Sequence, residues 1–323
     1  MLKIFEQIFR LDTRSSTTYP DELVHRATER AIDATDPRIR ILSSYEKKMR
    51  PAVIHAIHRV VNLVDELSAP VPMSDADCGA QSIMGTLFSS KESLRSAIAS
   101  DCACRDFREA ETHVAEPVTA LLLAQFSQKN TFGYDLVGDR TVADVPLTVV
   151  SFDDHRLIGL ATEEAETRRL LQLRAFDYLL MLGLTRITEV KEHRQDLMAR
   201  KRLLKAKLDI VSRSNGNLTD EPRLDDRRSL QQRMDKVEAD LREAGAEDTV
   251  LQRNLDIVVA TLATAEERLW LEKQVIYVDN MHYLRSAEYS NAVEFPLQML
   301  RDTEGRAMAA QMVEIPPGIL AGR

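Results

Sequence analysis

A seven-residue repeat in the C-terminal half of the chain constrains the fold more than any other feature. Two sets of mostly apolar residues alternate at spacings of four and three, which places them on one narrow stripe of a helix from about Arg223 to Lys273. Such a stripe has to bury itself against another helix. The first set is Leu230, Val237, Ala244, Leu251, Val258 and Ala265, and the second is Met234, Leu241, Asp248, Leu255, Leu262 and Leu269.

A second helix with a weaker stripe precedes this one, from about Thr162 to Val211, and a breaker-rich loop over 212–222 separates the two. Residues 186–207 hold eight basic and three acidic side chains, whereas 235–248 hold two basic and six acidic ones. Opposite charges that face each other across a seam favour antiparallel pairing. We therefore expect a projecting coiled-coil hairpin over 186–249. Its first stripe consists of Ile187, Val190, Leu197, Leu204, Leu208 and Val211.

The region 21–130 shows helical periods and predicts a helical bundle. One helix begins near Asp21 and another at Asp36-Pro37, since Asp is a good cap and Pro suits the first turn. Pro51 either kinks that helix or starts a new one, and residues 69–75 break the chain. Further helices are expected near 80–88, 90–99, 104–114 and 117–128.

β-branched runs and turn residues replace the helical period between Phe132 and Leu160, and they predict a three-strand meander. The turns fall at 138–139 and at Asp153-Asp154-His155. Pro146 can donate no ladder hydrogen bond, so it belongs at an edge or a bulge.

Period-two patterns return after Lys273. Residues 274–286 form either a hairpin or continued helix. A second hairpin is expected over 293–312, with its turn at 302–305, and Pro296 confines the first strand to an edge. The fold class is therefore α+β, mainly α with a smaller antiparallel β part, with the helical hairpin inserted between strand segments.

Five segments follow from these patterns. They are an amphipathic N-terminal helix and linker (1–20), the helical bundle (21–130), an α/β body (131–185 and 250–315), the projecting hairpin (186–249) and a tail (316–323).

The composition limits the class of protein and its compartment. The 43 Lys and Arg residues against 51 Asp and Glu residues give a net charge of −8, which argues against general nucleic-acid binding. Three cysteines, Cys78, Cys102 and Cys104, are too few for a disulfide framework. The chain also has neither a secretory signal nor an apolar run of membrane-spanning length, and we expect a cytoplasmic protein.

No motif in the sequence names a reaction. Phosphate-binding glycine loops, the G-x-S-x-G elbow and H-E-x-x-H are all missing. An enzyme is disfavoured, although dispersed catalytic residues would leave no motif. We expect no cofactor.

Asp153, Asp154 and His155 could coordinate a metal or share a proton, although a turn explains the two aspartates. Two cysteines and two histidines form a second candidate metal-ligand set. Cys102 and Cys104 would supply thiolates, and His55 and His58 would complete a tetrahedral zinc site. Structural zinc sites use C-x2–4-C spacings, so the single residue between the cysteines argues against a site. The alternative is two small thiols near a helix start and two histidines on a partly buried helix face.

Candidate interaction residues lie on the hairpin and at the N-terminus. The hairpin tip exposes Arg213, Asn215, Asn217 and Arg223. The basic run Arg200, Lys201 and Arg202 either flanks the acidic return helix or binds a phosphate backbone or an acidic partner. In 1–10, Leu2, Phe5 and Phe9 share one side of a short helix that can dock on its own core, on a partner or on a membrane surface.

The sequence as a whole predicts an interaction or scaffold protein without enzymatic activity. Its coiled-coil arm would be presented to a protein partner or to further copies of the chain, giving a homo-oligomer. One alternative is a peripheral membrane protein anchored by residues 1–10. Another is an enzyme or metalloprotein with dispersed site residues.

Overall fold

The computed structural model describes residues 19–74, 82–110, 116–137, 140–213, 222–243, 249–289 and 291–320. It has the α+β class expected from the sequence. The chain divides into two compact units, and the division falls within two of its helices. The sheet unit contains Ile57–Phe176 and Ala265–Arg323, and the helical unit contains Thr18–Ala56 and Asp177–Thr264. The domain limits expected from the sequence stay predictions.

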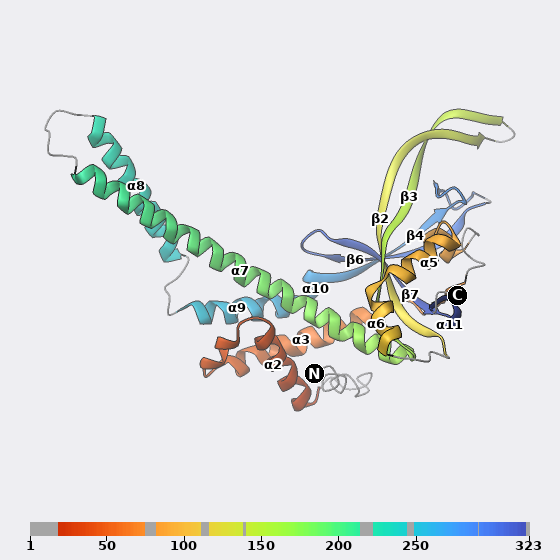
Figure 1. The fold of residues 1–323 in the computed structure, drawn as a ribbon, viewed down its shortest axis with the longest axis horizontal. Helices are drawn as coiled ribbons and strands as arrows, with labels where there is room; N and C mark the ends of the chain where they lie inside the picture. Colours follow the sequence, from red (N-terminus) through yellow and green to blue (C-terminus); the bar gives the residue numbers. More distant parts are fainter. Residues whose placement is uncertain are drawn as a thin grey trace. The chain divides into compact units, whose positions relative to one another are not determined.

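One seven-stranded sheet organises the sheet unit (Figure 1). Its order is β3-β2-β7-β6-β4-β5, and β1 pairs with β7 in parallel. A bridge between Val149 and Tyr283 joins β3 to the β4–β5 connection, so the two ends of this order meet. The strands are β1 (Val71–Pro72), β2 (Val118–Val137), β3 (Arg140–Ala161), β4 (Leu269–Val278), β5 (Leu284–Arg285), β6 (Val293–Asp302) and β7 (Ala307–Ile315).

The helix expected over 117–128 is wrong, because these residues begin strand β2. Over residues 118–124, β2 lies between β3 and β7 and is buried on both faces. Val118, Ala120 and Leu122 face one core, while Leu121 faces another with Val64 and Leu67. A central strand of this kind is apolar throughout, and periodicity alone does not distinguish it from a buried helix.

The three-strand meander is also wrong, because β2 and β3 form one long two-stranded ribbon. The register of β3 gains one residue over β2 at three places, which are β-bulges. A residue with positive φ lies at each place: Asp144 at 59°, Asp154 at 50° and Gly159 at 69°. Asp153-Asp154-His155 is therefore a bulge within β3, not a turn. Pro146 lies on an end strand of the order, as expected.

The C-terminal strands confirm both expected hairpins. β4 pairs with β5 through Tyr277 with Arg285 and Val278 with Leu284, which decides between the two readings of 274–286 in favour of strands. β6 and β7 pair around residues 302–306. Pro296 was expected on an edge strand, but β6 lies between β4 and β7. The expectation holds only locally, because β6 pairs with β7 over residues 299–301 alone, away from Pro296.

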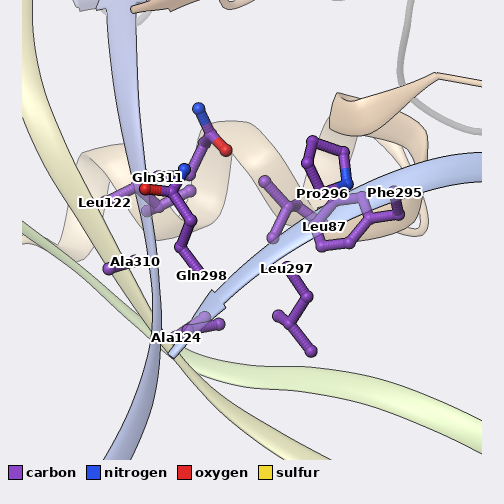
Figure 2. A pocket seen from close by; sticks show the side chains of 10 residues that line it. Leu87, Leu122, Ala124, Phe295, Pro296, Leu297, Gln298, Ala310 and Gln311 are labelled. Atoms are coloured by element: carbon purple, nitrogen blue, oxygen red, sulfur yellow. The ribbon is translucent and has the colours of Figure 1, made fainter. Parts of the chain in front are cut away.

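A small cavity lies where β6 and β7 separate (Figure 2). Its volume of about 10 Å³ is close to that of a single water site. Gln298 and Gln311 line it among apolar side chains. The Gln298 amide donates to the Ser68 hydroxyl oxygen at 2.7 Å and accepts from the Ser68 amide at 3.2 Å. The cavity therefore belongs to the interior of the sheet and is too small for a larger ligand.

Short helices contribute to the core on one face of the sheet. They are α4 (Ile83–Leu87), α5 (Lys91–Ser100), α6 (Cys102–Ala110) and α11 (Pro317–Leu320). Asp101 connects this layer to β3: its carboxylate accepts from the Cys104 amide at 2.9 Å and from the Leu157 amide at 3.0 Å. The side chain therefore caps α6 and also satisfies a backbone donor beside the Asp154 bulge.

The N-terminal helices are α2 (Asp21–Ala34), the 3₁₀ helix η2 (Pro37–Ile41) and α3 (Tyr45–Asp65). The helix expected at Asp36-Pro37 is only the short η2, and α3 begins six residues before Pro51. Asp36 is buried, accepts from Arg38 and accepts from the Asn254 amide at 2.8 Å. Burial raises the pKa of Asp36, but these hydrogen bonds outweigh that effect and leave it below its ordinary value.

The C-terminal stripe lies on several helices and one strand, and the continuous helix expected over 223–273 is wrong. The helices are α8 (Pro222–Glu243), α9 (Val250–Ala263) and α10 (Ala265–Arg268), and β4 starts at Leu269. Ala244, Gly245 and Asp248 lie outside the described residues. Upstream, α7 (Glu164–Arg213) is the long helix expected from the sequence. Within the described residues, no helix is both long and apolar enough to span a membrane.

Candidate interaction surface on helix α7

The distal part of α7 has an inner seam made of Leu197, Leu204, Leu208 and Val211. Leu197 is 3% exposed and the other three are half-buried. On α8, Met234 is 8% exposed. The Lys201 ammonium lies 2.9 Å from a Glu238 carboxylate oxygen, and this hydrogen bond lowers the pKa of Glu238. Lys201 and Glu238 therefore join α7 to α8 beside this seam.

A second apolar row, the outer strip, occupies another face of the same part of α7. It consists of Ala199, Leu203, Ala206 and Ile210, at spacings of four, three and four. At about 100° per residue, its centre lies roughly 140° around the helix from the inner seam. All four residues are exposed, with Leu203 at 57% and Ile210 at 67%. The distal part of α7 thus has two apolar faces, and only one is covered by the described residues.

Cations border the outer strip on both sides. At the same helical pitch, Arg200 and Lys207 lie on one side and Arg202 on the other. All three are exposed, and none has an ion pair with any described residue. The exposed Asp196 and Asp209 lie on these margins too, so the surface is apolar along its centre and has three cations against two acids along its margins.

The interaction residues suggested by the sequence have separate positions. Lys201 belongs to the inner seam through Glu238, whereas Arg200 and Arg202 flank the outer strip. Arg213 ends α7, and Arg223 is the second residue of α8. Asn215 and Asn217 lie outside the described residues, as do Leu2, Phe5 and Phe9. Their suggested roles stay predictions.

The suggested zinc ligands do not share one environment. Cys102, His55 and His58 are exposed, whereas Cys104 is fully buried. Burial, together with the nearby Asp101 carboxylate, raises the pKa of the Cys104 thiol to about 12. A thiol of this kind is a poor source of the thiolate that zinc binds.

Among the described residues, His25, Glu29 and Glu46 are the group whose potential metal-binding atoms converge within 4.8 Å. The Glu29 carboxylate is already engaged, since it accepts from the Tyr45 hydroxyl at 3.0 Å and from Arg40 at 2.8 Å. Burial and the Glu29 contact raise the pKa of Tyr45 to about 12. This polar network connects α2, η2 and α3, and an incoming cation would compete with Arg40. We therefore assign it a structural role.

His155 anchors the Asp154 bulge to α4. Its Nε2 lies 2.9 Å from the Leu87 carbonyl oxygen, and its ring stacks on Phe88 with centroids 4.3 Å apart. Burial lowers the pKa of His155, although the Leu87 contact and the neighbouring Asp153 and Asp154 act in the opposite direction. A neutral imidazole that donates to this carbonyl explains the residue without catalysis.

The outer strip was missed at the level of sequence, although its spacing is a heptad signal. The inner seam overlaps it in the same stretch, and only the exposure of each side chain separates the two. Comparisons with protein-family models, with curated proteins and with solved structures found no match.

Proposed function

We propose that this chain is a cytoplasmic interaction protein without enzymatic activity, and that α7 and α8 form an antiparallel coiled-coil arm that presents the outer strip to a protein partner. The observation that carries the proposal is the exposed row of Ala199, Leu203, Ala206 and Ile210. Burying a Leu or Ile side chain contributes about 1.5–3 kcal/mol to the free energy of association, so covering this row would stabilise a complex with a partner helix.

The charge pattern favours a different protein over a second copy of this chain. If two outer strips packed antiparallel about the point midway between Leu203 and Ile210, Lys207 of one copy would lie opposite Lys207 of the other. Like charges across a helical interface oppose pairing. An amphipathic helix with acidic margins satisfies both the apolar centre and the cations. We therefore propose an acidic helical segment as the partner.

The test is affinity capture from native lysate with the full chain as bait. Captured proteins are cross-linked, and the linked positions are mapped. We expect links to α7 near residues 199–210. The double variant Leu203→Ser/Ile210→Ser should lower capture at least tenfold, because it removes the apolar centre. Capture should also weaken as the salt concentration rises, because salt screens the exposed charges at the margins of the outer strip.

The matched control is Val275→Ser/Met281→Ser, which removes two exposed apolar side chains, 52% and 69% accessible, from the sheet unit. This variant should capture the partner as the unmodified chain does. Equal loss in both variants, or equal capture by both, contradicts the proposal. Intact-mass measurement adds a second check, since a dimer that disappears only in the strip variant would assign the strip to another copy of the chain.

A further inference from the structure

A cleft lies in the helical unit between α7 and the first turn of α9, and residues around η2 also line it. Its volume is about 620 Å³, within the range of small-molecule sites. Ile187, Val190, Met198 and Leu251 contribute apolar surface. The walls are held in place by the buried hydrogen bond from Asn254 to Asp36. The cleft is therefore formed between elements that contact each other directly.

Positive charge dominates the titratable groups of this cleft. The lining includes Arg38, Lys191, Arg194 and Arg253, with Asp36 as the single acid among the described residues. Asp36 already accepts from Arg38 through both carboxylate oxygens, at 3.0 and 2.9 Å. The Arg253 guanidinium donates to the Glu243 carbonyl oxygen at 3.0 Å. Lys191 and Arg194 are thus the cations whose charge is not matched by a described acid.

Arg194 carries the strongest sign of an external ligand. Its Nε is buried and has no hydrogen-bond partner among the described residues. Buried donors in native proteins are nearly always satisfied, by protein, water or a bound group. On the same helix, Lys201 lies at the inner seam, and the Glu238 carboxylate is its partner. Arg194 also lines the cleft, which has room for an acceptor beside its guanidinium group.

The start of α9 adds to the positive potential. The first turn of α9 has no acidic residue. The first amides of a helix have no intrahelical acceptors, and the helix dipole favours negative charge at this end. Val250 and Leu251 of this turn line the same cleft as Lys191 and Arg194.

We propose that the α7–α9 cleft binds a small amphipathic organic anion. Its carboxylate or phosphate group accepts from Arg194 and lies near Lys191, because a guanidinium matches the planar oxygens of such groups. Its apolar portion lies on Ile187, Val190 and Leu251. This site is separate from the outer strip, so either proposal can fail without the other.

Isothermal titration of the full chain tests the site with four probes: octanoate, octyl phosphate, n-octanol and inorganic phosphate. We expect one equivalent of octanoate or octyl phosphate to bind, and the better of these two to identify the preferred head group. The uncharged n-octanol lacks the acceptor, and inorganic phosphate lacks the apolar portion. Each should bind at least tenfold more weakly.

The variant Lys191→Gln/Arg194→Gln should lower the affinity for the amphipathic anion at least tenfold, the effect expected for lost charge-assisted hydrogen bonds. The control Arg200→Gln/Lys207→Gln removes the same charge from the margin of the outer strip and should bind as the unmodified chain does. Absence of binding by both amphipathic anions overturns the proposal. Binding that is unchanged in the cleft variant also overturns it.

A ligand-free measurement adds a readout that does not depend on the probes. If Arg194 has no partner within the protein, Arg194→Met removes an unsatisfied buried donor and should leave the thermal midpoint unchanged or raise it. A lower midpoint would show that Arg194 is satisfied by the folded chain itself, and it would overturn the assignment of Arg194 to a ligand.

Discussion

Charged side chains have different roles in the sheet unit and on the distal part of α7. In the sheet unit, Asp101, Asp279 and Asp302 each accept hydrogen bonds from two backbone amides at a helix start, bulge or turn. On α7, Arg200 and Arg202 have no ion pair with a described residue. The first group satisfies backbone donors at these positions, whereas folding makes no such use of the second. Charges that the fold does not use remain available to a partner.

The largest effect is expected at Asp279. It forms an ion pair with Arg285 at 2.6 Å, and these side chains are only 8% and 9% exposed. Asp279→Ala removes one partner and leaves a buried guanidinium, which lowers the free energy of unfolding by about 3–5 kcal/mol. Denaturation followed by fluorescence measures this effect, because Trp270, the only tryptophan, lies in β4 of the sheet unit.

Arg202→Gln is the contrasting variant on α7, and it should change stability by less than about 0.5 kcal/mol in denaturation followed by circular dichroism. A large loss of stability from Arg202→Gln would remove the distinction between the two regions. It would also show that the margin of the outer strip contributes to folding.

The next comparison concerns leucine. Leu122 is 2% exposed on β2, and Leu203 is 57% exposed on the outer strip. Leu122→Ala should lower the free energy of unfolding by about 2–5 kcal/mol because it creates a cavity in the core. Leu203→Ala should lower it by less than about 0.5 kcal/mol in denaturation followed by circular dichroism. Equal losses would mean that Leu203 is covered in the folded chain and is not a docking residue.

Two glycines should give effects of opposite sign. Gly159 has a φ of +69° in the third bulge of β3, and an added Cβ would lie 3.2 Å from Leu171. Gly159→Ala should destabilise the sheet unit by about 1–2 kcal/mol, the cost of the left-handed region for other residues. Trp270 fluorescence during denaturation reports this loss.

Gly183 lies inside α7, where an added Cβ would meet Thr261 atoms at ordinary contact distances of 3.8–4.0 Å. Gly183→Ala should therefore stabilise the helix by about 0.5–1 kcal/mol, because alanine loses less backbone entropy on folding. Circular dichroism at 222 nm during thermal unfolding measures the change. A loss of stability here would indicate a closer approach of α7 and α9 than the structure has.

The elements that sequence analysis predicted correctly are those whose two faces differ in environment. β6 alternates between buried Phe295 and Leu297 and exposed Glu294 and Pro296, so its period of two is visible. The first part of β2, residues 118–124, is buried on both faces, which removes that signal and explains the false helix. The bulges were also read wrongly, because Asp153 and Asp154 look like a turn unless the register of β2 is known.

The candidate sites could be predicted only in part, for a related reason. The spacing of Leu203 and Ile210 is visible in the sequence, but which heptad row faces α8 depends on packing. The cleft depends on Asp36 meeting Asn254, residues 218 positions apart, and no local pattern reports that contact. Arg194 lies on a helix that the sequence predicts, but its unsatisfied Nε becomes apparent only from the burial of its surroundings.

The smallest effect is the pH dependence contributed by His155. Burial lowers its pKa in the folded chain below the ordinary value of 6.5, so the unfolded chain binds more protons just below pH 6.5. The stabilisation is fully present above pH 6.5 and is lost as the pH falls below it. Denaturation followed by Trp270 fluorescence should therefore show a falling midpoint between pH 7 and 5.

His155→Gln should make the decline shallower, whereas His25→Gln, at an exposed position, should leave it unchanged. Identical declines in all three proteins would mean that the Asp154 bulge does not depend on a neutral imidazole, and that the sheet unit titrates through its carboxylates alone.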